Sequence, residues 1–182
     1  MNEDQIRQYS RQILLREVGG VGQKKLLAAP IEIIGWSDAI EVAVTYLSAG
    51  GSPIASGIRE GVGFLSRRPL PETHQPAIAV VTLPHPDPLP QGPEREFTLQ
   101  VVIGSEILLR TPTTCAACFE KTRASITNDT PAPVIAGSLG ALLLQRHLLG
   151  FTEESQRFVW RDGTFQPAQL FRCPEHSNSI QE

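Results

Sequence analysis

The sequence predicts an α/β fold, and three observations indicate it. Residues 31–34 form a short apolar run, followed by a glycine and a segment whose apolar residues recur at helical spacing. Residues 97–103 and 106–110 have the composition of two strands joined near Gly104. Further along, Asp162-Gly163 separates two more runs and is the strongest hairpin signal in the chain. A sheet flanked by helices, with a C-terminal β-hairpin, therefore accounts for most of the sequence.

A helix is predicted from Asn2, where Asn2 and Gln5 have the spacing of a capping box. We expect the glycines within 19–22 to end this helix, and Lys24 and Lys25 to form a basic turn before the first strand.

The remaining predicted elements follow in chain order. They are a strand at 31–34, a helix with the buried stripe Ile40, Ala43, Val44 and Leu47, a weak strand at 54–58, a strand at 77–83, strands at 97–103 and 106–110, a helix at 138–149 closed by Gly150, and hairpin strands at 157–161 and 164–171. We expect one domain, 1–182, made of an N-terminal helical segment (1–29), a degenerate nucleotide-binding βαβ unit (30–68), a proline-rich arm (69–96) and a C-terminal part (97–182).

Composition excludes several classes of function. The chain has 182 residues, 41% hydrophobic and 19% charged, with a formal net charge of −3. Lys and Arg are scattered rather than striped, so we expect no nucleic-acid partner. The apolar stretch at 139–149 is too short to cross a bilayer, and the polar start shows no signal peptide. These features predict a cytoplasmic protein without membrane contact, in which disulfides are not expected.

Prolines concentrate in the middle of the chain, where eight of the fifteen fall within residues 69–93. Because proline lacks a backbone donor and has a fixed φ, this segment is expected to form a surface loop or polyproline II arm. It is interpreted either as a linker or as a docking segment for a partner.

All three cysteines lie in two knuckles, Cys115-Ala-Ala-Cys118 and Cys173-Pro-Glu-His176. Ligands at positions i and i+3 allow a tight turn to present both side chains to one ion, and two such turns complete a tetrahedron. The spacing predicts a structural zinc site with the ligands Cys115, Cys118, Cys173 and His176. Two other interpretations stay open: a redox CxxC pair activated at a helix start, which leaves Cys173 and His176 unexplained, and coincidence.

Two long segments resemble the ThiF/MoeB/HesA family, the bacterial relatives of ubiquitin-activating enzymes. They are QIRQYSRQILLREVGGVGQKKLLAAPIEIIG at 5–35, and CAACFE, PVIAGSLGALLLQRHLLG and RCPEH between 115 and 176. The resemblance implies a Rossmann-like sheet with flanking helices, truncated in the middle. In that family the sheet binds ATP and the enzyme adenylates the C-terminal glycine of a small ubiquitin-like or sulfur-carrier protein, usually within a dimer.

Departures from the family pattern indicate that the catalytic parts are missing. The family keeps several glycines after the first strand, whereas this chain keeps only Gly35, as a degenerate remnant of the cofactor-binding loop. Asp38 lies near the start of the following helix, where it repels an anion. The acidic residue that holds the ribose is replaced by Ile58 in the simplest register, and the aspartate that positions magnesium is missing. We therefore do not expect ATP as a cofactor.

Arg11 matches the arginine of the family's RYSRQ motif, which reaches across the dimer toward the partner's ATP; alternatively it is a solvated helix residue. The favoured function is a non-catalytic, zinc-stabilised, dimeric binding or scaffold module. The alternative is an adenylyltransferase, acting alone or as the half of a heterodimer that supplies Arg11 in trans. The implied partners are a second copy or an intact relative, together with a small ubiquitin-like or sulfur-carrier protein.

Overall fold

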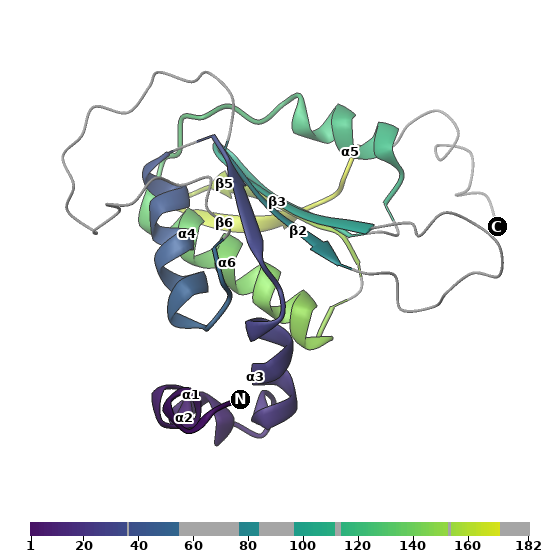
Figure 1. The fold of residues 1–182 in the computed structure, drawn as a ribbon. Coiled ribbons are helices and arrows are strands. Elements are labelled where there is room, and N and C mark those ends of the chain that lie inside the picture. The colour runs from purple at the N-terminus through teal and green to yellow at the C-terminus, as the bar shows by residue number, and fades with distance from the viewer. Residues whose placement is uncertain (36, 55–76, 84–96, 112–113, 153, 172–182) are drawn as a thin grey trace, which may run out of the picture.

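The chain forms a mixed α/β fold in which a six-stranded sheet carries helices on both faces (Figure 1). The computed structural model describes residues 1–35, 37–54, 77–83, 97–111, 114–152 and 154–171, with the backbone alone at 77–83 and 97–98. Helices α4 (Asp38–Ala49) and α6 (Pro133–Leu149) pack on one face, and α5 (Ala116–Arg123) packs on the other. None of the helices in these ranges combines the length and apolar character needed to span a bilayer.

The strands lie across the sheet in chain order. They are β1 (Ile31–Ile34), β2 (Ala77–Leu83), β3 (Phe97–Ile103), β4 (Glu106–Arg110), β5 (Gln156–Arg161) and β6 (Thr164–Ala168). All neighbouring pairs are antiparallel, which differs from the parallel pairing of a Rossmann sheet. Short loops explain part of this difference. Two-residue loops such as Gly104-Ser105 and Asp162-Gly163 can join antiparallel strands but not parallel ones.

A single parallel contact within the described ranges lies at the other edge of β1. Ile31 forms a parallel bridge with Ile54, and the Ile31 N–H donates to the carbonyl of Pro53 at 2.8 Å. The chain therefore leaves β1, forms α4 and returns beside β1 in the same direction. This is the start of the predicted βαβ unit, and the rest of its expected second strand, 55–58, lies outside the described residues.

Alternation along β3 and β4 divides the core between the two faces of the sheet. Val101 and Leu109 face the layer of α4 and α6, whereas Val102 and Leu108 face α5. Since successive side chains of a strand point to opposite faces, a strand buried on both sides is apolar throughout. Strands β3 and β4 thus lie in the middle layer of a three-layer structure.

Helices α4 and α6 pack closely, and two glycines of α6 make this possible. A Cβ on Gly137 would overlap the carbonyl oxygen of Ala39 in α4, and one on Gly140 would overlap Ile103 in β3. The predicted α4 stripe of Ile40, Ala43, Val44 and Leu47 is buried as expected. Helix α6 begins earlier than the predicted residue 138, because Pro133 is compatible with the first turn, and it ends at Gly150 with φ 86 as predicted.

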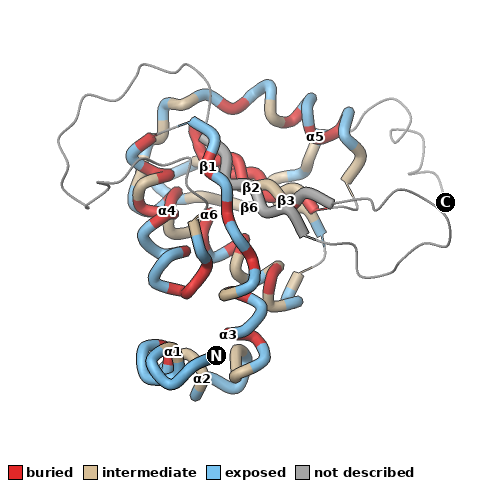
Figure 2. The backbone as a smooth tube through the Cα atoms, in the orientation of Figure 1, coloured by how far each residue is buried: buried red, intermediate tan, exposed pale blue. Residues whose placement is uncertain are grey.

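The N-terminal segment corrects two predictions. It forms α1 (Glu3–Gln8), α2 (Ser10–Ile13) and α3 (Gly19–Leu27), and the capping box of Asn2 and Gln5 is present. The glycines do not end a helix but begin α3, and Lys24 and Lys25 lie inside that helix. A Cβ on Gly22 would meet Leu149 at 2.7 Å, so close packing against α6 explains this glycine within a helix. Most of α1 and α2 is exposed, and both lie apart from the sheet (Figure 2).

The C-terminal hairpin is confirmed. Asp162 and Gly163 both have positive φ, 51° and 79°, as a type I′ turn requires. Trp160 and Phe165 face each other across the two strands, with ring centroids 5.0 Å apart in an edge-to-face arrangement.

Candidate functional site

The first predicted knuckle lies at the start of α5, a helix that the sequence analysis did not predict. Cys115 is the N-cap residue and Cys118 lies in the first turn, where it is buried. The Phe119 N–H donates to the Cys115 carbonyl at 3.0 Å, which closes this turn. The two residues of the predicted knuckle therefore lie at the start of one helix.

A cluster of hydroxyl groups fixes the segment that leads into Cys115. The Thr111 N–H donates to the Ser155 hydroxyl at 2.8 Å, and the two hydroxyl oxygens are 3.1 Å apart. The hydroxyl of Thr114 also hydrogen-bonds that of Ser155. Ser155 comes directly before β5, so this cluster ties the residues before α5 to the start of the next strand.

Helix α5 is seated on the sheet by a small apolar cluster. Phe119 is 1% exposed and packs with Val102 and Leu108 of the sheet and with Ile126. Leu170, beyond β6, packs against the same cluster. The chain that follows the hairpin therefore lies against α5, which is the helix that carries the first knuckle.

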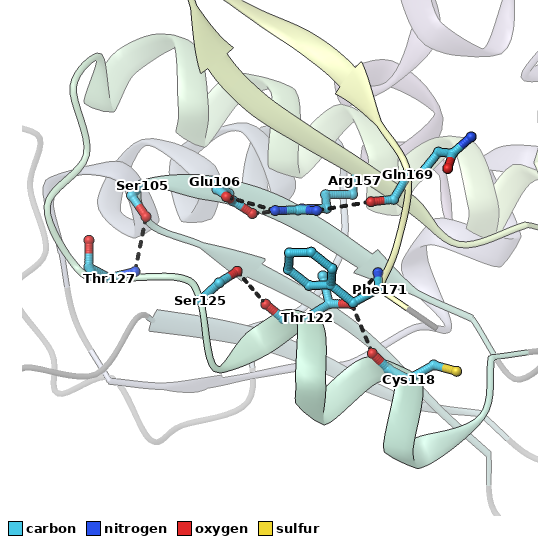
Figure 3. Close-up of polar contacts among 9 residues, drawn as sticks. All are labelled: Ser105, Glu106, Cys118, Thr122, Ser125, Thr127, Arg157, Gln169 and Phe171. Atoms are coloured by element: carbon cyan, nitrogen blue, oxygen red, sulfur yellow. Dashed lines mark hydrogen bonds and ion pairs between the residues drawn. The ribbon is translucent and has the colours of Figure 1, made fainter. Parts of the chain in front are cut away.

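One buried hydroxyl connects the two chain segments (Figure 3). Thr122 is completely buried, and its Oγ1 donates to the carbonyl of Cys118 at 2.8 Å. The same oxygen accepts a hydrogen bond from the Phe171 N–H at 3.1 Å. A hydroxyl can donate once and accept as well, so Thr122 links the backbone of a predicted ligand residue to the C-terminal segment.

Arg157 holds the same segment from the sheet. Its Nε and Nη2 donate to the two carboxylate oxygens of Glu106, at 2.8 and 2.9 Å, and its Nη1 donates to the carbonyl of Gln169 at 2.9 Å. The guanidinium also lies over the ring of Phe171, 4.3 Å from its centroid. Only 10% of the Arg157 side chain and 18% of the Glu106 side chain are exposed, so this ion pair is largely shielded from solvent.

The other two predicted ligands, Cys173 and His176, lie outside the described residues. Among the residues that the structure describes, no three His, Cys, Asp or Glu side chains gather as a metal site would require. The described residues thus include the first predicted knuckle, and they end at Phe171, two residues before the second.

The turn after β1 is where a phosphate would bind in a nucleotide site. Gly35 has φ 80, and Ser37 is the N-cap residue of α4. The Ser37 hydroxyl accepts a hydrogen bond from the Ile40 N–H at 3.2 Å, and Asp38 and Glu41 occupy the first turn. A donor of the helix N-terminus is therefore satisfied within the chain, and the nearby charges are negative.

A groove of about 450 Å³ opens elsewhere, between α4, α6 and β6. It is lined by Tyr46, Ile135, Ser138, Leu139, Ala141, Leu142, Gln145, Thr164 and Phe165. Gly35 and Ser37 are not among these residues, so the groove is separate from the turn after β1.

Arg11 lies on α2 and is exposed. It takes part in none of the side-chain hydrogen bonds or ion pairs found among the described residues. Its position fits either interpretation of this residue, a solvated side chain or one that contacts a partner.

Neither protein-family models nor curated proteins match this chain. The resemblance to the ThiF/MoeB/HesA family therefore depends on the quoted motifs alone.

Sequence analysis missed Thr122 and the pair of Arg157 and Glu106. The partners in that pair are 51 positions apart, and those in the Thr122–Phe171 bond are 49 apart. Nothing local marks such partners in a single sequence. The one available signal was a threonine within a short helix, where its hydroxyl can bond the carbonyl four residues earlier.

Proposed function

We propose that this chain is a non-catalytic binding or scaffold module of the ThiF/MoeB/HesA type, dimeric and stabilised by zinc at Cys115, Cys118, Cys173 and His176. Its β1–α4 unit is the remnant of a Rossmann-like nucleotide site that serves packing. The unit retains the strand, the helix and the parallel return at Ile54.

The observation that carries this proposal is the cap on α4. A helix N-terminus binds phosphate through unsatisfied N–H groups and a positive field. Here the Ser37 hydroxyl accepts from the Ile40 N–H, and Asp38 and Glu41 add negative charge in the first turn. A phosphate at this position would compete with an internal cap and be repelled by two carboxylates. Adenylyl transfer depends on positioning and on cation clamps, so without a phosphate site the chain lacks a basis for catalysis.

The donor set fits zinc. Three thiols and an imidazole are the ligands of a closed structural site, and a closed shell leaves no position for water. Cys173 follows Phe171 by two residues, which span at most about 7 Å of extended chain. Phe171 is itself hydrogen-bonded to Thr122, whose hydroxyl bonds the Cys118 carbonyl. This chain of contacts supports a site in which zinc ties the C-terminal segment to α5.

Assigning all three cysteines to zinc leaves none for a disulfide, a thioester or a persulfide. This assignment supports a reducing, cytoplasmic environment. It also argues against the redox interpretation of the CxxC pair, which leaves Cys173 and His176 without a role.

Exposed apolar side chains support a dimer. Ile6, Leu14, Leu15 and Val21 lie on or between the N-terminal helices and are 49%, 84%, 52% and 73% exposed. Contiguous exposed apolar surface marks sites that a partner covers, and we propose the N-terminal helices as that site. The partner is either a second copy or an intact relative.

An adenylyltransferase role in trans is the second candidate, and it is motivated by the match of Arg11, exposed on α2, to the arginine of the family's RYSRQ motif. In that case Arg11 supports the active site of an intact relative, whose substrate is a small ubiquitin-like or sulfur-carrier protein. Both candidates share the prediction that this chain binds no nucleotide by itself.

Calorimetric titration of Mg-ATP into the zinc-loaded protein tests the proposal. We expect no saturable heat with nucleotide up to the millimolar range. Saturable binding in the micromolar range would contradict it, since it would require a working phosphate site. Mixing the chain with an intact relative and a carrier protein, and following pyrophosphate exchange with and without Arg11→Ala, separates the two candidates.

A further inference from the structure

We infer that the N-terminal segment (1–29) of each copy docks in the groove between α4, α6 and β6 of a second copy. The inference rests on the proposed dimer, and it adds the surface that receives the exposed apolar side chains of the N-terminal helices. The groove is lined by described residues of α4, α6 and β6.

One side of α6 carries apolar side chains that are covered at one end of the helix and exposed at the other. Ile135, Leu142 and Leu149 lie on this side, because residues seven positions apart on a helix differ in direction by only about 20°. Leu149 is partly buried and packs beside Gly22 of α3, where a Cβ would lie 2.7 Å from its side chain. Ile135 and Leu142 are 50% and 49% exposed. The N-terminal segment therefore already covers one end of this side of α6 within its own copy.

The exposed part of this side of α6 forms one wall of the groove of about 450 Å³. Tyr46 of α4 and Phe165 of β6 line the groove together with Ile135 and Leu142. Tyr46 is itself 52% exposed. Since this surface is apolar and open to solvent, it is suited to a partner that presents apolar side chains of its own.

The N-terminal segment presents such side chains. Leu14 and Val21, at 84% and 73%, are the most exposed large hydrophobic residues in the described part of the chain. Val21 lies in α3 directly before Gly22, the residue by which this helix packs against α6. The same helix that covers one end of α6 in its own copy thus carries an apolar side chain available to another.

Charge supports a second copy as the occupant. Residues 1–29 contain five Lys and Arg against three Asp and Glu, a formal net charge of +2. Residues 31–54, which include β1 and α4, contain three acidic residues and no Lys or Arg. One of the three, Asp38, precedes Ala39, whose carbonyl oxygen lies against Gly137 of α6, next to Ser138 in the groove lining. Opposite charges on the two surfaces favour contact between copies.

The positions of the two surfaces along α6 allow a closed dimer. The groove lies along residues 135–145, and α3 contacts the helix at Leu149, near its C-terminal end (Figure 1). When two copies pack with their α6 helices antiparallel, each N-terminal segment faces the groove of the other copy. Such a two-fold arrangement makes the same contact twice and leaves no surface open for further copies.

Sedimentation velocity over a range of protein concentrations, with one variant for each surface, provides the test. Leu14→Asp alters the N-terminal segment and Ile135→Lys alters the groove, and each should weaken dimerisation at least about 10-fold. Ile34→Lys is the matched control. Ile34 is 51% exposed but follows Ile33, which packs in the core on the α4 side, so its side chain points to the opposite face of the sheet. This control should dimerise within about twofold of the wild type.

Mixing the two variants distinguishes this arrangement from a dimer that pairs like surfaces. In a mixed dimer the native N-terminal segment of one copy meets the native groove of the other, whereas neither variant can form that contact with itself. Mixed dimers should therefore be at least about 10-fold tighter than dimers of either variant. Native mass spectrometry with one variant ¹⁵N-labelled detects them, and far-UV circular dichroism of each variant checks that it is folded.

Two results would overturn the inference and leave the proposed dimer in place. They are dimerisation of Ile135→Lys as tight as that of the wild type, and mixed dimers no tighter than those of the separate variants. Failure of the dimer itself is recognised separately, because the wild type would then sediment as a monomer at every concentration, and this result would overturn both.

Discussion

The two faces of the sheet are held by different kinds of interaction. On one face, α4 and α6 bury an extensive apolar core that includes Ile40, Leu47 and Leu144. On the other, α5 rests on a small cluster around Phe119, and the chain beyond β6 is held there chiefly by polar contacts of Thr122 and Arg157. The first face is held mainly by apolar burial. The second has little apolar surface to bury, which is the situation in which a structural metal adds most.

The largest effect is expected on the apolar face. Leu144 is 0% exposed in α6, and Leu144→Ala should lower the free energy of unfolding by about 3 to 4 kcal/mol, because it removes buried methyl groups and leaves a cavity. Urea denaturation measures this change. Leu142, on the same helix but 49% exposed, is the control, and Leu142→Ala should change stability by less than about 0.5 kcal/mol. Similar losses for the two variants would show that α6 does not bury the face assigned to it.

A somewhat smaller effect is expected on the α5 face. Arg157→Met removes one partner of a shielded ion pair and leaves Glu106 uncompensated, which should cost about 3 kcal/mol. Arg123 forms an ion pair with Glu120 at the surface, with side chains 34% and 58% exposed, so Arg123→Met should cost less than about 0.5 kcal/mol. Chemical denaturation of both variants gives the comparison. An Arg157→Met protein as stable as Arg123→Met would mean that polar contacts do not hold this face.

The same difference between the faces explains how far the sequence predicts the structure. Local patterns predict the strands at 31–34, 97–103 and 106–110, the buried stripe of α4, and the turn at Asp162-Gly163. Each of these predictions depends on residues that are close in the sequence or on the regular spacing of buried residues. The apolar face is built mainly from such elements, so most of it follows from the sequence.

Long-range contacts are what the sequence does not predict. The antiparallel order of β1, β2 and β3 depends on how distant segments pair. The close approach of Gly22 to Leu149, which leaves no room for a Cβ, likewise depends on a residue far along the chain. On the α5 face, the hydrogen bond between Thr122 and Phe171 joins residues that are 49 positions apart in the sequence. Cys115 and Cys118 lie at the start of α5, and the role of all four residues as zinc ligands stays a prediction.

The measurement that tests the central claim most directly is the metal content of purified protein and of Cys173→Ser, determined by elemental analysis after exhaustive desalting. A closed four-ligand site on the α5 face predicts about one zinc ion per wild-type chain and a large loss in the variant. A wild type without zinc, or a Cys173→Ser protein that retains it fully, would contradict the claim that a metal joins the C-terminal segment to α5.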